Sequence, residues 1–169
     1  MCVFLFNFEH KLEKPFKIKL TPKQAIIKLG NYCAYQERCQ KEVIEKLAEL
    51  GVYGNDAQEI LAELITLNYV NEERFAKAFS SGKFRHKRWG KQKITRELNA
   101  REISAYCIKQ ALLEIPDDDY AETMQQLAAK KWNMLKQINP FEKRNNLAKY
   151  LIGKGFEPSL VWDYVKSFK

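Results

Sequence analysis

The most distinctive chemistry in the sequence lies in a basic segment between Ser80 and Arg101. The segment holds eight lysines and arginines against one acid, Glu97, and so carries a net +7 in a chain whose formal charge is +8. The basic residues are Lys83, Arg85, Lys87, Arg88, Lys91, Lys93, Arg96 and Arg101. Such side chains neutralise phosphates and release the counterions around nucleic acids. The segment predicts a binding surface for DNA phosphates or for an acidic protein, with a solvated cationic face as the plainer alternative.

Two aromatic residues are interleaved with these charges, and a second basic region follows further along the chain. Phe84 and Trp89 can stack on unpaired bases or pack into the protein core.

The second basic region predicts an auxiliary contact or ordinary surface solvation. It contains Lys130, Lys131, Lys136, Lys143 and Arg144, together with Lys149 and Lys154.

No pattern of catalytic or metal-binding residues accompanies the basic segment. The four cysteines show no close pairing, and His10 and His86 stand apart, so no zinc site is indicated and the thiols are expected to pack. The sequence has no phosphate-cradling glycine loop and no His-Glu-x-x-His. We expect neither an enzyme nor a cofactor.

The start of the chain gives an expectation for location. Its apolar run, Cys2 to Phe8, is shorter than the ~20 residues that span a bilayer and lacks the features of a secretory signal. We therefore expect a cytoplasmic protein without membrane contact.

Helix signals dominate the elements that must position these residues. Thr21 and Asn139 each precede a proline and stand three residues before Gln24 and Glu142, as in capped helix starts, and Asn55 precedes Gln58 by the same interval. Helix stops are expected at Gly51 and at Gly153 or Gly155, because glycine adopts positive φ at low cost.

Apolar pairs spaced by four residues recur along the chain. The first pairs, Val43 with Leu47, Ile94 with Leu98 and Leu147 with Leu151, begin 51 and 53 residues apart. Each is followed by a turn and a second pair: Ile60 with Leu64, Ile108 with Leu112, and Val161 with Val165. A further helix is expected to complete each unit ahead of its first pair, at about Pro22 to Ala34, Glu72 to His86 and Asp118 to Met134. The spacing predicts three helices per repeat and nine in total.

The fold predicted from these patterns is all-α, with three tandem three-helix units in an elongated, curved array. The units are expected at 22–68, 69–115 and 116–169, after an N-terminal arm at 1–21 in which alternating residues favour either a short hairpin or an irregular arm. A monomer is expected, because each unit already packs against its neighbour. The residues expected in the core include Leu61, Leu64, Phe75, Phe79, Ile108, Leu112, Leu127, Leu151 and Trp162.

Three stretches resemble the RecX family. Residues 37–43 read Glu-Arg-Cys-Gln-Lys-Glu-Val, which is similar to the family's Glu-Arg-Ser-x-x-Glu-Leu, with Cys39 in place of a capping serine. Residues 67–76 and 90–98 resemble its central signature, although Asn68 and Glu72 replace the usual Gly and Asp. Residues 151–157 resemble its final Gly-Phe turn. The resemblance covers roughly residues 30–168.

This resemblance implies a regulator that binds the filament of the RecA recombinase on DNA and modulates, most simply inhibits, its activity in recombination and DNA repair. It implies no catalytic site. The alternative is a helix-turn-helix-like DNA-binding protein that acts without a recombinase.

Overall fold

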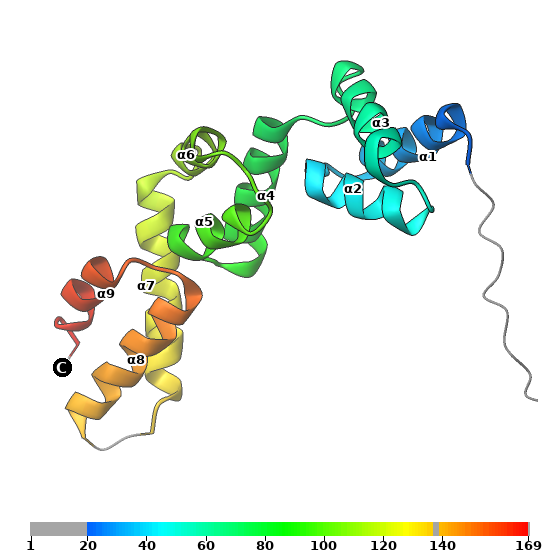
Figure 1. The fold of residues 1–169 in the computed structure, drawn as a ribbon. Coiled ribbons are helices and arrows are strands. Elements are labelled where there is room, and N and C mark those ends of the chain that lie inside the picture. Colours follow the sequence, from blue (N-terminus) through cyan, green and yellow to red (C-terminus); the bar gives the residue numbers. More distant parts are fainter. Residues whose placement is uncertain (1–19, 137–138, 169) are drawn as a thin grey trace, which may run out of the picture.

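The protein is described by a computed structural model that covers residues 20–136 and 139–168. This part of the chain contains nine helices and no strand, as predicted. Helices α1 to α3 form unit one, α4 to α6 unit two and α7 to α9 unit three, and the three units follow one another in an elongated, curved array (Figure 1). Their bounds are α1 Pro22–Tyr35, α2 Gln40–Glu49, α3 Gly54–Thr66, α4 Glu72–Lys87, α5 Lys91–Asn99, α6 Ala105–Leu113, α7 Asp117–Met134, α8 Pro140–Lys154 and α9 Pro158–Val165. The all-helical tandem fold is thus confirmed. The predicted unit boundaries stay predictions, and residues 1–19 of the arm lie outside the described residues.

Capping side chains explain where several helices begin. Thr21 and Gln24 form a complete capping box at α1, and the Asn139 side chain accepts from the backbone N–H of Phe141 at α8, as the sequence predicted. The prediction for Asn55 was wrong, because α3 already begins at Gly54 and no side chain caps it. Cys39 precedes α2 without a capping hydrogen bond, since a thiol is a weak acceptor.

The repeated apolar pairs form the centre of each unit. Val43, Leu47, Ile94, Leu98, Leu147 and Leu151 are all fully buried. Their partners in the following helices are buried too, except Leu112, which is partly buried. Trp162 is 40% exposed, so its assignment to the core was wrong: on α9 it lies beside Val161, which takes the buried position.

Units two and three share one apolar core, whereas unit one has its own. The exception is Cys39, at the start of α2, which packs into the core of units two and three. Cys33, Cys39 and Cys107 are buried free thiols, consistent with a packing role.

The joint between units two and three is built from backbone contacts and aromatic rings. The Gly90 N–H donates to the Lys154 carbonyl at 2.9 Å, and the Gln92 N–H donates to the Gly155 carbonyl at 3.0 Å. A Cβ atom on Gly90 would lie 2.2 Å from the carbonyl carbon of Gly155, and Gly155 itself has a φ of 98°. Only glycines permit this approach.

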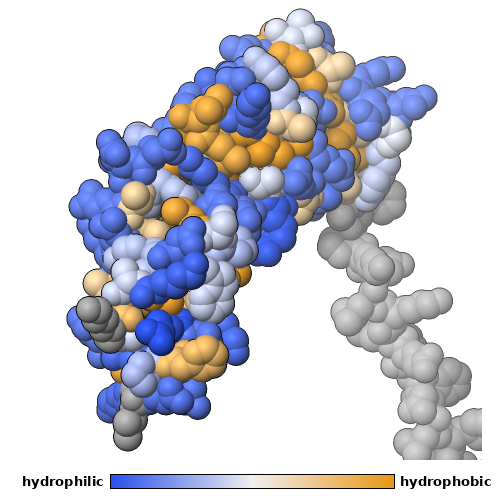
Figure 2. All heavy atoms as spheres, turned by 90° about the vertical axis from the view of Figure 1, so that its left-hand side faces the viewer, coloured by the Kyte–Doolittle hydropathy of each residue, from blue (hydrophilic) through white to orange (hydrophobic). Residues whose placement is uncertain are grey.

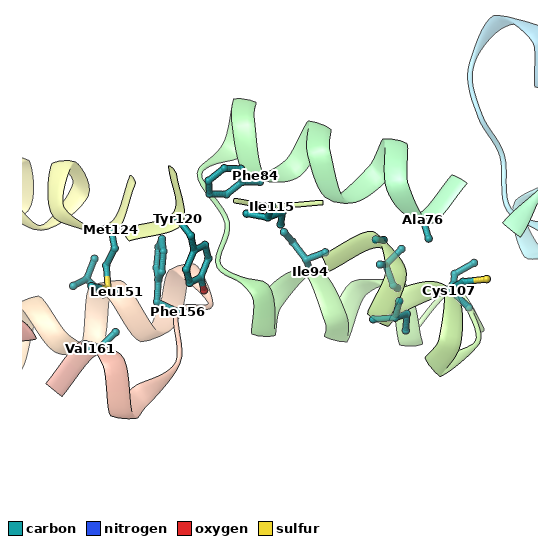
Figure 3. Packing of buried hydrophobic residues seen from close by; sticks show 14 of the residues in the cluster. Ala76, Phe84, Ile94, Cys107, Ile115, Tyr120, Met124, Leu151, Phe156 and Val161 are labelled. Carbon is teal, nitrogen blue, oxygen red and sulfur yellow. The ribbon is translucent and has the colours of Figure 1, made fainter. Parts of the chain in front are cut away.

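Tyr120 joins the same two units through its hydroxyl. The hydroxyl accepts from the Lys91 N–H at 2.9 Å and donates to the Glu157 carboxylate at 2.7 Å. Its ring lies between those of Phe84 and Phe156 (Figure 3). Burial, and then the hydrogen bond to Glu157, raise the pKa of Tyr120 well above its usual value.

The joint between units one and two is mainly ionic. Arg74 donates from Nε to Glu37 at 2.6 Å, and its Nη2 donates to the Asn68 carbonyl at 3.0 Å in the connecting segment. Lys41 donates to the Glu102 carboxylate at 3.0 Å and to the Ala100 carbonyl at 3.1 Å.

None of the helices in the described ranges combines the length and hydrophobicity needed to cross a bilayer.

Candidate nucleic-acid interface

The basic segment spans the end of α4, a tight turn and the start of α5. Arg88 closes α4 in the left-handed conformation, with a φ of 54°, and its N–H donates to the Phe84 carbonyl at 3.0 Å. The last turn of α4 is basic, which complements the partial negative charge of a helix C-terminus. Gly90 then begins α5 against unit three. The turn therefore fixes the segment at the joint between the two units.

The eight predicted basic residues do not all face one surface. Lys83, Lys87 and Arg101 line a cleft of about 410 Å³ between α2 and α4 that also contains Glu37 and Glu42. This group therefore faces carboxylates as well as solvent.

The remaining basic residues point in other directions. Arg85 lines a small cleft beside α6 and α7, and Arg88 donates to the Thr123 hydroxyl of α7 at 3.3 Å. Lys91 and Arg96 line a cleft beside α6. Lys93 approaches Trp89. The helical geometry thus divides a run that is continuous in sequence.

Two of the eight charges are neutralised within the protein. Lys91 pairs with Asp117 at 2.9 Å, and Arg101 pairs with Glu97 at 3.2 Å and with Glu42 at 3.7 Å. The other six basic residues have no ion pair within residues 20–136 and 139–168. Most of the segment's charge is therefore available to an external partner.

Two lysines converge on one aromatic ring in unit two. The Nζ of Lys83 lies 5.3 Å and that of Lys93 4.4 Å from the centre of the Trp89 ring, and Lys83 also lies 5.0 Å from the Phe79 ring. All four side chains are half-buried. Cation–π contacts of this kind hold the lysine stems against the surface while the ammonium groups keep their charge.

Unit three repeats the arrangement with a tyrosine. Lys131 of α7 and Lys154 of α8 lie 5.3 and 5.8 Å from the centre of the Tyr150 ring. Lys154 is the neighbour of Gly155, which packs directly against the backbone of Lys93. The backbone segments that carry the two groups therefore meet at the joint. We call Lys83, Lys93, Lys131 and Lys154, with the rings of Phe79, Trp89 and Tyr150, the lysine–aromatic track.

The track favours phosphate contacts over base stacking. The Trp89 ring already lies under two ammonium groups, so a base would have to displace them. Phe84 is only 6% exposed and packs beside Tyr120, which makes it a core residue. Fixed ammonium groups bind phosphates without reading the base sequence.

The other predicted auxiliary residues are divided between packing and free surface. Lys143 lies 4.1 Å from the Trp132 ring, and Arg144 donates to the Phe168 carbonyl at 3.3 Å, so both support the packing of unit three. Lys130 and Lys136 are exposed and have no partner among the described residues.

Sequence reasoning missed the rings of Phe79 and Tyr150. A usable signal existed, because each ring stands four residues before a lysine, Lys83 or Lys154, on a predicted helix. The contact of Lys131 with Tyr150 has no such signal, because it joins two helices.

The fold and this surface define a class of protein: a tandem array of three-helix units with a cationic face at the joint of two units. Comparisons with known proteins agree with the fold. The family model of the second three-helix domain of RecX matches residues 71–112, and that of the third matches residues 117–165. Together these matches cover more than half of the chain.

Similar proteins carry the same family name. The chain is 32% identical over 92 residues to "Regulatory protein RecX" of Lactobacillus gasseri, covering 54% of this chain and 34% of that protein. It is 28% identical over 139 residues to that of Bacillus licheniformis, covering 82% of this chain and 53% of that protein. The chain thus spans about half of such relatives, or less. The crystal structure of RecX from Lactobacillus salivarius superposes with a TM-score of 0.74 at 24% identity, covering 87% of this chain and 97% of the other, and supports the fold.

The chain belongs to the RecX family.

Proposed function

We propose that this chain regulates a RecA-type recombinase by binding its DNA filament, and that it lowers the activity of the filament. The observation that carries the proposal is the lysine–aromatic track, which adjoins the joint between units two and three. Its four ammonium groups lie against aromatic rings and have no ion-pair partner among the described residues, so they are available to neutralise phosphates. The family relationship supplies the direction of the effect.

The proposal extends to the location, oligomeric state and DNA contacts of the protein. The protein acts as a cytoplasmic monomer that contacts the phosphates of single- or double-stranded DNA. The contacts come from the basic residues between Ser80 and Arg101: Lys83, Arg85, Lys87, Arg88, Lys91, Lys93, Arg96 and Arg101. Within that set the geometry favours Lys83 and Lys93. It is a regulator rather than a catalyst.

The first test measures the filament itself. Recombinase assembled on single-stranded DNA is titrated with the protein, and ATP turnover, strand exchange and co-sedimentation are followed. We expect turnover and strand exchange to fall as the protein co-sediments. Unchanged turnover and unchanged filament length at stoichiometric excess would contradict the proposal.

The second test assigns the contact to the track. The variant Lys83→Ala, Lys93→Ala, Lys154→Ala removes three track charges, and Lys130→Ala, Lys136→Ala, Lys149→Ala removes three exposed charges elsewhere as a matched control. Each phosphate contact contributes about 0.7 to the salt slope on single strands and about 0.9 on duplexes. We expect the track variant to lose roughly 2 to 3 units of slope, and the control to keep it. Equal losses in both variants would exclude the track as the principal contact.

Discrimination between sequences separates this function from that of a helix-turn-helix DNA binder without a recombinase. A sequence-specific reader loses about 1 to 3 kcal/mol for each mismatched base pair. We expect affinities for DNAs of different sequence to agree within about twofold, because phosphate contacts carry no sequence information. A strong sequence preference together with no filament binding would favour the alternative.

A further inference from the structure

A groove with an apolar floor runs between α5 and α6 of unit two. It consists of two adjoining clefts of about 400 and 430 Å³. They share Lys91, Thr95, Asn99 and Leu112. No residue of the lysine–aromatic track lines this groove, although Lys91 and Arg96 of the wider basic set do.

The floor of the groove includes an exposed apolar side chain. Leu113 is 68% exposed at the end of α6, and it lines the groove with the partly buried Leu112 and the buried Ile108. A single exposed leucine is ordinary, but apolar side chains that gather in a hollow are typical of a binding surface. Figure 2 views the molecule from the left-hand side of Figure 1, where α6 lies, and shows apolar surface gathered in the upper part of this face.

The rim of the groove is positively charged. Arg96 of α5 and Lys109 of α6 are exposed, and neither has a hydrogen-bond or ion-pair partner in the described ranges. Lys91 is already paired with Asp117, and the one lining acid, Glu157, accepts from the Tyr120 hydroxyl. Each of the two helices therefore presents one free cation beside the apolar floor.

The groove and the lysine–aromatic track lie on different sides of α5. Lys91, Thr95 and Asn99 follow one another at intervals of four residues and so share a side of the helix, whereas Lys93 is rotated by about 200° from Lys91. The floor of the groove and the track therefore face different directions.

We propose that the α5–α6 groove binds an acidic protein segment that carries apolar anchor residues. The anchors contact Leu112 and Leu113, and the carboxylates contact Arg96 and Lys109. Nucleic acid fits the groove poorly, because a phosphate backbone gains nothing from an apolar floor. The inference rests on the proposed function in that the recombinase protein supplies the segment, while its DNA contacts the track.

The closing experiment identifies the occupant directly. A photoreactive benzoylphenylalanine replaces Leu113 in the groove or, as a control, Tyr106, which is 65% exposed on α6 but does not line the groove. Each protein is irradiated on the assembled filament, and the crosslinked peptides are identified by mass spectrometry. We expect the Leu113 position to crosslink to a recombinase segment rich in acids and aliphatic residues, and the Tyr106 position to crosslink at least about tenfold less.

Binding measurements on variants complete the test. Leu113→Ser with Lys109→Ala should weaken binding to DNA-free recombinase by about tenfold and leave affinity for single-stranded DNA within about twofold. Lys83→Ala with Lys93→Ala should do the opposite. Crosslinks from Leu113 to DNA, to a basic segment or to a second copy of this chain, or unchanged recombinase binding by the groove variant, would overturn the inference. If the wild-type protein fails to co-sediment with the filament at all, the proposed function fails instead.

Discussion

The two joints between units differ in chemistry. Units two and three meet through backbone hydrogen bonds, two glycines in close approach and a shared apolar core. Units one and two meet mainly through Arg74, Lys41 and Arg101 and their acidic partners, and unit one keeps a core of its own. Buried backbone and apolar contacts are insensitive to salt, whereas exposed ion pairs are screened. Units two and three are therefore joined by contacts that resist salt, whereas the contact of unit one with unit two depends mainly on charge.

This difference matters for the proposed function. The lysine–aromatic track lies at the joint of units two and three, where aromatic rings hold its lysine side chains against the protein surface before binding. Preorganised groups lose less freedom on binding than mobile ones.

The largest expected effect comes from filling the glycine contact. In Gly90→Ala the new Cβ would meet backbone atoms of Gly155, which cannot move aside as a side chain can. We expect the free energy of unfolding of units two and three to fall by roughly 3 kcal/mol, measured by urea denaturation. Gly153→Ala is the control, because nothing lies within 4 Å of its added Cβ, and it should leave stability unchanged or raise it slightly. Equal stability of the two variants would show that the close approach is not needed.

Removing the Tyr120 hydroxyl should have the next largest effect. Tyr120→Phe leaves the Lys91 N–H and the Glu157 carboxylate without this partner and should cost about 1 to 2 kcal/mol at pH 7.

The same variant makes a prediction for alkaline pH. Burial and Glu157 raise the pKa of Tyr120 in the folded protein, so folding favours the neutral phenol. Its contribution to stability is complete below the ordinary tyrosine pKa of 10.0 and is lost as the pH rises above that value, where the unfolded chain ionises first. The stability difference between wild type and Tyr120→Phe should therefore shrink from pH 9 to pH 11. A difference that grows over this range would contradict the assignment.

Arg74→Ala tests the ionic joint. Arg74 connects Glu37 of unit one to the segment that links the units, so its loss should cost about 1 kcal/mol and broaden the distribution of distances between units one and three. Double electron–electron resonance between spin labels placed at Gln58 and Gln125 measures this distribution of distances. Arg85→Ala, which removes an exposed arginine without an ion pair in the described part of the chain, should leave it unchanged.

The smallest effect is expected at the exposed pair of Lys41 and Glu102. Lys41→Ala should change the free energy of unfolding by less than about 1 kcal/mol. At 50 mM salt the same labels should show a broader distance distribution in Lys41→Ala than in the wild type. At 500 mM the two distributions should agree, because salt screens the pair in the wild type. Lys23→Ala, on the exposed side of α1, serves as the control. A Lys41 effect that persists at high salt would mean that its hydrogen bond to Ala100, not the charge, carries the contact.

Much of the fold could be predicted because it depends on local rules. The four-residue spacing within each apolar pair, the capping box at Thr21 and the stop at Gly155 all act within a few residues of sequence, and the structure confirms them. Asn55 failed as a cap because α3 starts one residue earlier, a difference that local capping signals do not resolve.

The sequence by itself determined the helices, their repeat and the concentration of positive charge between Ser80 and Arg101. Only the tertiary structure decided which charges act together. A helix directs successive side chains around its axis, so Arg85 separates from Lys83 although the two are close in sequence, while Lys93 and Lys131 join the same track from different units. Charge density is a property of composition, but a surface depends on packing, and here that packing rests on two glycines 65 residues apart, Gly90 and Gly155.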